Sequence, residues 1–300
     1  MKVLLFGKNG QLGWEIQQLL TASAASYGVE QCIALDYPEV DFTHPKRVRM
    51  ALSNVKGGDV LINAAAYTAV DQAESEQELA FAVNRDAPAL IAEEAKRIGA
   101  FFIHFSTDYV FDGTKNAPYV ETDVPHPLSI YGNSKMMGEQ AVQAIGGDFI
   151  ILRTSWVYSL RGDTFVNKVL RWARSQTVLR VVDDQISNPT YAKALASATL
   201  TLLQKAYQHS FEWLKERRGL YHLAGNGYTS RYEWALEILK LDPLKEEHVV
   251  DQVLPAKTAD FHTPALRPLF SALSCQLFAE TFGFQLPPWQ ESLQKALLGE

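Results

Sequence analysis

The sequence predicts an α/β fold, in which a doubly wound parallel sheet carries helices on both faces and a smaller α/β lobe follows it. Two observations support this prediction. Up to about residue 155, short apolar runs rich in Val, Ile, Leu and Phe alternate with segments of helical pattern. These apolar runs are almost unbroken, which is typical of strands buried on both faces of a parallel sheet.

In the first half, strands and helices are expected to alternate from the first residues onward. The expected strands are residues 2–7, 31–36, 59–64, 101–106 and 149–155. The expected helices are residues 11–22, 44–54, 74–98 and 128–146. Pro88 lies inside the third helix, where its missing backbone donor predicts a kink or a break.

After residue 155 the pattern is less regular. Strands are expected at 178–182 and 219–225, and helices at 163–175, 190–209, 230–240 and after Pro288. Residues 251–270 contain three prolines and are predicted to form an extended loop. No linker separates the two halves, so we expect the lobe to interleave with the sheet, with segments near 178–225 rejoining it.

Gly7, Gly10 and Gly13 form a GxxGxxG motif between the first strand and the first helix. The first glycine permits a tight turn, the second lets a pyrophosphate approach the backbone, and the third lets helix and strand pack closely. The helix N-terminus offers unpaired N–H groups to the phosphates. The motif predicts a Rossmann-type dinucleotide-binding domain over residues 1–155 and leaves 156–300 as mainly a substrate-binding lobe.

Asp36 ends the second strand, where a carboxylate can hydrogen-bond the adenosine ribose of a dinucleotide. It would repel a 2′-phosphate, whereas Lys8, Lys46 and Arg47 could attract one. The choice between NADH and NADPH therefore stays open. Further cofactor contacts are expected near the same edge of the sheet, from Asp41, Phe42, Ala64, Ala65 and Ala66.

Tyr131 and Lys135 lie four residues apart in the run SIYGNSKMMGEQA and hence on one face of an expected helix. A nearby ammonium favours the phenolate, so Lys135 is expected to lower the pKa of Tyr131 toward the range of a general acid. Reduction of a ketone leaves negative charge on oxygen. Tyr131 can quench that charge with a proton, and the Thr107 hydroxyl can hydrogen-bond the same oxygen. The pattern predicts a nicotinamide-dependent redox site.

Four motifs carry a family resemblance: GxxGxxG, NAAA at 63–66, STDYVFDG at 106–113 and YGNSK at 131–135. Their layout resembles the extended short-chain dehydrogenase/reductase family. Together with RTSWVYS and DDQISNPT they are similar to the dTDP-4-dehydrorhamnose reductases of that family, through nearly the whole chain and most strongly between residues 1 and 190. The resemblance implies reduction of the 4-keto group of dTDP-4-dehydro-L-rhamnose to dTDP-L-rhamnose by NADPH or NADH.

The resemblance also implies roles for single residues. Tyr131 corresponds to the proton donor and Lys135 to the residue that binds the nicotinamide ribose. Thr107 and Asp108 correspond to substrate contacts beside the reacting carbonyl, and Trp156 to a wall of the sugar pocket. The remaining matches are Arg267 as a substrate contact and Gly10, Gln11, Leu12, Asp36, Asp41, Phe42, Ala64, Ala65 and Ala66 as cofactor contacts. Candidates for the positive charge that a nucleotide diphosphate needs are Arg153, Lys168, Arg180 and Arg267.

The chain departs from the family pattern at two places. On the helix after DQ-x-x-x-PT the family carries an acidic residue associated with a magnesium site at a dimer contact, and Lys193 stands there although Glu15 is retained. An ammonium cannot ligate magnesium, so we expect no metal site and leave a metal-independent homodimer open. The family's RP-x-NS pattern is altered at residues 267–271, which bears on substrate contacts in the lobe.

Composition narrows the expected partners and location. The chain is 47% hydrophobic and 21% charged, as an ordinary globular protein is, and its net charge of -6 argues against nucleic-acid binding. Cys32 and Cys275 form no CxxC motif, which fits a reducing compartment. The first strand leaves no room for a signal peptide, and no apolar run approaches the ~20 residues that span a bilayer. We expect a cytoplasmic protein with a dTDP-sugar substrate and no membrane or nucleic-acid partner.

Two other functions fit parts of this pattern. A nucleotide-sugar 4-epimerase or dehydratase would share the cofactor site, but a dehydratase usually pairs an acid with a following Glu, and here Tyr109 follows Asp108. A regulatory subunit of the methionine adenosyltransferase type keeps this fold and acts as a partner protein. Nothing in the sequence disables Tyr131, Lys135 or Thr107, so we favour an enzyme.

Overall fold

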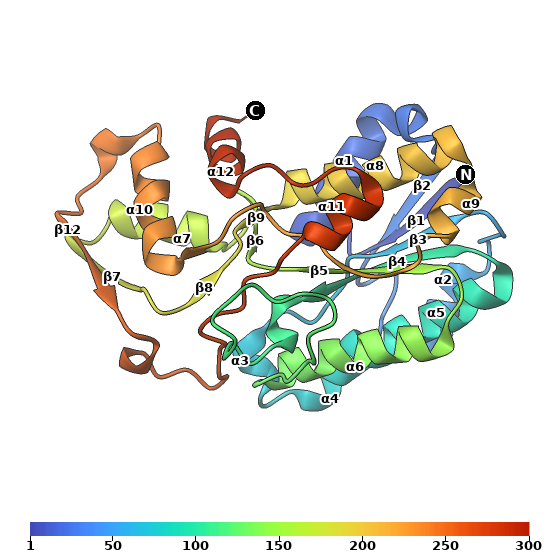
Figure 1. Ribbon diagram of the computed structural model, residues 1–300, viewed down its shortest axis with the longest axis horizontal. Helices are drawn as coiled ribbons and strands as arrows, with labels where there is room; N and C mark the ends of the chain where they lie inside the picture. Colours follow the sequence, from blue (N-terminus) through green and yellow to red (C-terminus); the bar gives the residue numbers. More distant parts are fainter. Residues whose placement is uncertain (300) are drawn as a thin grey trace.

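A six-stranded sheet forms the centre of the computed structural model, which describes residues 1–299 (Figure 1). The strand order is β10-β5-β4-β3-β1-β2, and every neighbouring pair is parallel. The predicted doubly wound parallel sheet is confirmed. The strands are β1 (Lys2–Phe6), β2 (Gln31–Leu35), β3 (Val60–Asn63), β4 (Phe101–Thr107), β5 (Phe149–Thr154) and β10 (Gly219–His222).

Helices cover both faces of this sheet and enclose two apolar cores (Figure 1). One core holds Ile16 and Leu200 from two packed helices, and the other holds Val48 and Val142. Burial of strands on both faces explains their near-continuous apolar sequence. The first face carries α1 (Gln11–Ser23), α8 (Ala192–His209) and α11 (Gln276–Phe282), and the second carries α2 (Pro45–Leu52), α5 (Ala87–Ile98) and α6 (Ile130–Ile145).

The helix expected over 74–98 begins at Gln77 and contains an irregular turn. It consists of α4 (Gln77–Phe81), a π-helical turn at Ala82–Asp86 and α5, which follow one another directly, and the short helix α3 (Val70–Ala73) precedes it. Pro88 lies near the start of α5, directly after the π-helical turn at Ala82–Asp86. The irregularity that the proline predicts is therefore this π-helical turn just before it, and not a break in the helix. Other short elements are α9 (Phe211–Lys215) and 3₁₀ turns at Ala24–Tyr27, Asp108–Val110, Lys245–Glu247 and Thr258–Asp260.

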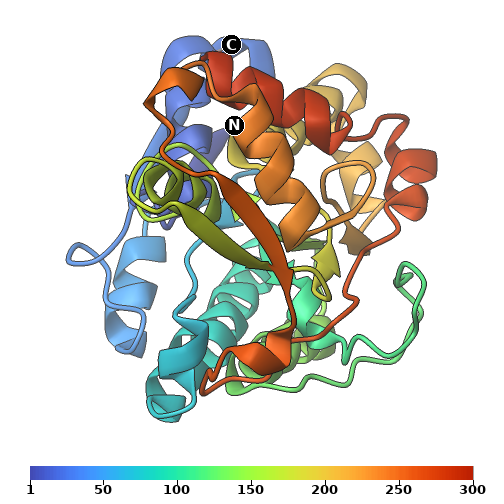
Figure 2. The same ribbon diagram turned by 90° about the vertical axis from the view of Figure 1, so that its left-hand side faces the viewer.

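A smaller lobe stands beside the carboxyl edge of the sheet and faces the viewer in Figure 2. Its core packs Val169, Val181, Trp234 and Leu293 together. Part of the loop expected over 251–270 is a strand, because residues 252–256 pair in parallel with the strand at 178–182. The lobe contains α7 (Phe165–Ala173), β7 (Val178–Val182), α10 (Arg231–Leu241), β12 (Gln252–Ala256) and α12 (Trp289–Leu298).

The chain passes repeatedly between the sheet and the lobe. After β5, the strand β6 (Val157–Tyr158) pairs with β9 (Thr190–Tyr191), and β8 (Ile186–Ser187) pairs with β11 (Thr229–Ser230). β10 and α8 lie in the central sheet and on its face, whereas β7 belongs to the lobe. The division near residue 155 stays a prediction. No helix within residues 1–299 combines the length and apolarity needed to cross a membrane.

Candidate active site

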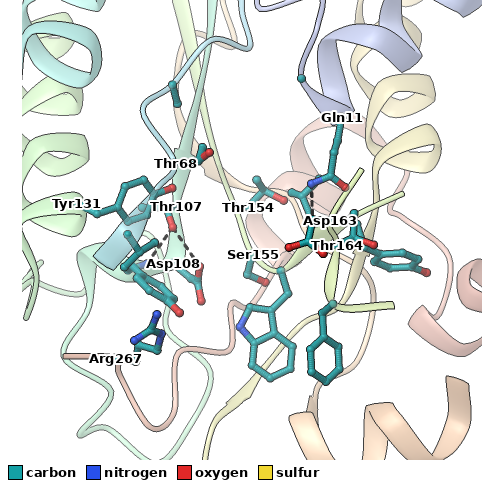
Figure 3. A pocket seen from close by; sticks show the side chains of 18 of the residues that line it. Gln11, Thr68, Thr107, Asp108, Tyr131, Thr154, Ser155, Asp163, Thr164 and Arg267 are labelled. Carbon is teal, nitrogen blue, oxygen red and sulfur yellow. Dashed lines mark hydrogen bonds between the residues drawn. The ribbon is translucent and has the colours of Figure 1, made fainter. Parts of the chain in front are cut away.

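The carboxyl ends of the parallel strands open into a cavity of about 980 Å³ that extends toward the lobe (Figure 3). Gly7 follows β1, Asp36 follows β2, and Ala64 follows β3, and all three line this cavity. Thr107 ends β4 and Thr154 ends β5 on the same edge. Strand order reverses between β1 and β3, and ligands of doubly wound sheets bind at such a reversal.

The glycine-rich turn brings the backbone unusually close to its neighbours. Gly7 has φ +90°, and a Cβ there would lie 2.5 Å from the Ala65 nitrogen. A Cβ on Gly13 would lie 2.0 Å from the Gly7 oxygen, so this glycine packs α1 against the turn. Gly10 precedes α1 and forms no side-chain cap, so the first N–H groups of α1 are not capped by the N-cap side chain. Gly10, Gln11 and Leu12 line the cavity at this helix N-terminus, which is a favourable place for phosphate.

The expected adenosine side of the cavity contains Asp36 and Phe42 but not Asp41. Asp36 lines the cavity, and its carboxylate accepts hydrogen bonds from the backbone of Asn9 at 2.9 Å and Tyr37 at 2.8 Å. The Asp41 carboxylate instead accepts from the Thr43 nitrogen at 2.9 Å and closes a turn. Its role as a cofactor contact stays a prediction, as do the roles of Phe42, Ala64, Ala65 and Ala66, which line the cavity.

Tyr131 and Lys135 both reach the cavity from α6, whose first turn is capped by Ser129. Lys135 is 2% exposed, and its Nζ donates to the Phe105 oxygen at 2.6 Å. Burial lowers the pKa of Lys135 to about 8, although the charge of Glu139 opposes that shift. Burial raises the pKa of Tyr131, opposite to the sequence expectation, although a hydrogen bond with Thr107 pulls it down. The phenol therefore stays protonated at neutral pH.

Thr107 and Asp108 lie beside Tyr131 in the cavity wall (Figure 3). The Thr107 hydroxyl donates to Asp108 Oδ1 at 3.1 Å and accepts from the Tyr109 nitrogen at 3.1 Å. Burial raises the pKa of Asp108 to about 6, and hydrogen bonds from Ser271, Ser187 and Thr107 hold it below a still higher value. The assignment of both residues as substrate contacts stays a prediction.

The lobe contributes an aromatic wall around Trp156. The Trp156 ring stacks on Trp234 with ring centres 5.5 Å apart, and its backbone has φ +41°, a strained value for a non-glycine residue. The Arg231 guanidinium lies 3.9 Å from the centre of the Trp156 ring. A flat apolar ring at this position can pack against a pyranose, which is the predicted role of Trp156.

Three of the four cationic side chains expected near a diphosphate line the cavity, namely Lys168, Arg180 and Arg267. Arg267 Nη2 donates to Asp71 Oδ2 at 2.7 Å, which holds the loop after β12 against α3. Arg153 instead forms a buried ion pair with Glu139 at 2.6 Å behind the strand ends. A buried guanidinium needs a carboxylate partner, and Glu139 is that partner for Arg153. The charge of Arg153 is therefore neutralised by Glu139 and is not supplied to the cavity.

Sequence reasoning did not identify Arg231, which lines the cavity and is hydrogen-bonded to the side chain of Tyr109. It is the first residue of α10 and lies directly after the N-cap residue Ser230, which forms a capping box with Glu233. An arginine in a first helical turn is common, so no local signal marks this residue. Its importance follows from the fold, which brings α10 to the cavity.

Comparison with known proteins places this site in a family. The pattern of the RmlD substrate binding domain family matches residues 1–299. A protein of Burkholderia thailandensis named dTDP-4-dehydrorhamnose reductase is 38% identical over 299 residues, covering 97% of this chain and 96% of that protein.

Two solved structures are similar over their full lengths. One is a dTDP-4-dehydrorhamnose reductase from Clostridium acetobutylicum, with TM-score 0.88 and 34% identity over 100% of both chains. The other is a dTDP-4-dehydrorhamnose reductase from Bacillus anthracis in complex with NADP, with TM-score 0.87 and 31% identity over 100% of both chains. The chain is thus a member of the RmlD substrate binding domain family.

Proposed function

We propose that this protein is an NAD(P)H-dependent oxidoreductase that reduces the 4-keto group of dTDP-4-dehydro-L-rhamnose to give dTDP-L-rhamnose. One observation carries the proposal. Tyr131, Lys135 and Thr107 meet in a cavity that joins the glycine-rich turn to the aromatic wall of the lobe. Relatives with the name dTDP-4-dehydrorhamnose reductase support the choice of substrate.

The protein's own residues bind, orient and supply a proton in this reaction. The turn at Gly7 and Gly10 would hold the coenzyme pyrophosphate at the start of α1, and Asp36 would bind the adenosine ribose. Lys135 would bind the nicotinamide ribose. When bound, the reduced coenzyme supplies a hydride to the carbonyl carbon.

Tyr131 would donate the proton that the carbonyl oxygen needs. Its raised pKa keeps the phenol protonated at neutral pH, which suits a donor in the direction of reduction. Trp156 would contact the sugar ring, and the guanidinium of Arg267 at the cavity would attract the diphosphate. Proton and hydride together complete the reduction of one ketone to one alcohol.

Partners and location follow from this substrate. We infer a cytoplasmic enzyme that acts on a nucleotide sugar, without a nucleic-acid partner. A homodimer that needs no metal is compatible with this function. The net charge of -6 supports the exclusion of nucleic acid, because phosphate backbones require clustered Lys and Arg.

The test is a screen of 4-keto-6-deoxy nucleotide sugars with NADH and with NADPH, followed by determination of the product's stereochemistry. We expect stoichiometric oxidation of the coenzyme and formation of dTDP-L-rhamnose. A 4-epimerase would give product without net oxidation of added coenzyme. A regulatory subunit would give no turnover with any of these sugars.

A further inference from the structure

The cationic side chains of the cavity differ in whether a carboxylate neutralises them. Besides Lys135, the cations that line the cavity are Lys168, Arg180, Arg231 and Arg267. All but Arg231 form ion pairs with aspartates, namely Lys168 with Asp163 at 3.0 Å, Arg180 with Asp260 at 2.7 Å, and Arg267 with Asp71 at 2.7 Å. Arg231 forms no ion pair with any carboxylate in residues 1–299, so no direct contact within the protein neutralises its charge.

The Arg231 guanidinium is held in place by neutral groups. It lies 3.9 Å from the centre of the Trp156 ring and 4.8 Å from that of the Phe165 ring, and it donates a hydrogen bond to the phenol oxygen of Tyr109. Stacking on aromatic rings and a bond to a phenol orient a guanidinium without neutralising it. A guanidinium has more N–H donors than this one bond uses, so others remain for a ligand in the cavity.

The position of Arg231 has a cost for the fold. Burial lowers its pKa, interactions with Tyr109 and Asp108 oppose that shift, and the like charge of Arg267 strengthens it. Arg231 is also the first residue of α10, where the positive end of the helix dipole disfavours a cation. An arginine stays protonated at neutral pH all the same, so the cavity wall holds a partly desolvated cation. An anionic ligand beside it would offset this cost.

We propose that Arg231 binds the β-phosphate of the nucleotide sugar and thereby selects nucleoside diphosphates over monophosphates. The β-phosphate is the one that bears the sugar, and Arg231 stacks on Trp156, the predicted wall of the sugar pocket. Arg267 also donates to the Tyr109 phenol, so the two guanidiniums converge on one point of the cavity. Two planar donor groups at one point suit the oxygens of a phosphate. This role rests on the proposed reductase function.

The experiment measures the dissociation constants of dTDP and dTMP by calorimetry for the wild type, Arg231→Met and Arg231→Lys. Neither ligand has a ketone, so binding is measured apart from turnover. Methionine keeps an unbranched apolar stem beside Trp156 and removes the charge. We expect Arg231→Met to weaken dTDP binding about tenfold or more, the scale of a lost charged hydrogen bond, and to change dTMP binding less than about twofold. Arg231→Lys should recover part of the loss for dTDP.

Arg217→Met is the matched control. Arg217 also stacks on a tryptophan, with its guanidinium 4.5 Å from the centre of the Trp213 ring, and it does not line the cavity. Its affinities for dTDP and dTMP should both stay at the wild-type values. In turnover, Arg231→Met should raise KM for the nucleotide sugar about tenfold or more with kcat changed less than about threefold, because the β-phosphate takes no part in the chemistry.

Phosphorus-31 NMR of bound dTDP tests the same contact, even if Arg231→Met fails to fold. The resonance of the bound β-phosphate should differ between the wild type and Arg231→Lys, while that of the α-phosphate stays the same. An unchanged β-phosphate resonance would overturn the proposal. An equal loss of affinity for dTDP and dTMP would also overturn it, as would a raised KM for the nucleotide sugar with normal dTDP affinity. Absent turnover in the wild type would instead refute the proposed function.

Discussion

Lys135 donates its ammonium hydrogen bond to the carbonyl oxygen of Phe105, at 2.6 Å, inside the protein. This contact ties α6 to the end of β4, the strand that also carries Thr107. It fixes the position of the Lys135 head group, and Lys135 lines the cavity. The proposed function assigns this ammonium to the nicotinamide ribose. The pKa of Tyr131, four residues earlier in α6, is raised mainly by burial.

We predict that activity declines as the pH rises through about 8, where buried Lys135 loses its proton. The ammonium is the charged form, so it is present below this pKa and lost above it. Lys135→Met should abolish the alkaline limb together with most of kcat. Lys96→Met is the matched control, because Lys96 Nζ also donates to a backbone oxygen, that of Ile145, away from the cavity. A wild-type profile that stays flat to pH ~10 would refute this assignment.

Tyr131→Phe should lower kcat by about 10²-fold or more, the usual scale for a lost general acid, while coenzyme binding is retained. Turnover and coenzyme fluorescence titration measure the two effects separately. Tyr221→Phe is the control. Tyr221 is also buried, lies on β10 and donates its phenol hydrogen to Arg217 O at 2.9 Å. Near-normal turnover of Tyr131→Phe would end its assignment as the proton donor.

Gly13→Ala should destabilise the fold, and Gly10→Ala should not. A Cβ on Gly13 would collide with the Gly7 backbone at 2.0 Å, whereas one on Gly10 would meet the Gly7 oxygen at 3.4 Å, an ordinary contact. Overpacking of this kind costs about 1–3 kcal/mol or more. Thermal melting should show the loss in Gly13→Ala alone, and coenzyme titration should show weaker binding in both. Equal melting temperatures would contradict the packing role of Gly13.

The sequence predicted the central sheet well because a strand buried on both faces needs a continuous apolar run, as Val60 to Ile62 illustrate. It predicted the glycine-rich turn because the glycine spacing at Gly7 and Gly13 reflects local backbone contacts. Strand β12 was missed, since the prolines around Pro255 suggest a loop. Within residues 1–299, β12 pairs only with β7, so one side of β12 forms no hydrogen bonds to a neighbouring strand. The missing N–H of Pro255 is tolerated in such an edge strand.

The electrostatics of the site could not be predicted from spacing. Four-residue separation correctly placed Tyr131 and Lys135 on one helix, but the pKa of the phenol depends on its burial. The hydroxyl donors to Asp108 come from Ser187 and Ser271, which lie far away along the chain. Their approach is a property of the lobe's long-range pairing, and nothing beside Asp108 in the sequence signals it.

Glu39 is predicted to bias coenzyme choice toward NADH. Its carboxylate lies 2.6 Å from the Lys8 ammonium, so a 2′-phosphate would have to compete with it for that cation. Glu39→Gln should raise the ratio of kcat/KM for NADPH to that for NADH by about two- to fivefold, since exposed ion pairs are weak. Asp36→Ala should shift the ratio in the same direction by removing a charge beside the ribose.

The control for these variants is Glu30→Gln, which removes an exposed carboxylate at the opposite end of β2, where it pairs with the N-terminus. An equal shift in this control would mean that net charge alone sets the ratio. An unchanged ratio in Asp36→Ala would show that Asp36 does not face the ribose.

Activity and subunit association are predicted to be insensitive to chelators. The carboxylate of Glu15 is buried, which raises its pKa, and the charges of Lys193 and Arg161 partly offset that shift. Two cations beside one carboxylate disfavour a divalent ion at the same place. Gel filtration and turnover with EDTA, and again after addition of magnesium, measure the prediction. Lys193→Glu gives the converse variant, in which a second carboxylate replaces the ammonium and magnesium should begin to affect association. A wild-type activity that EDTA removes and magnesium restores would show that other carboxylates complete a metal site around Glu15.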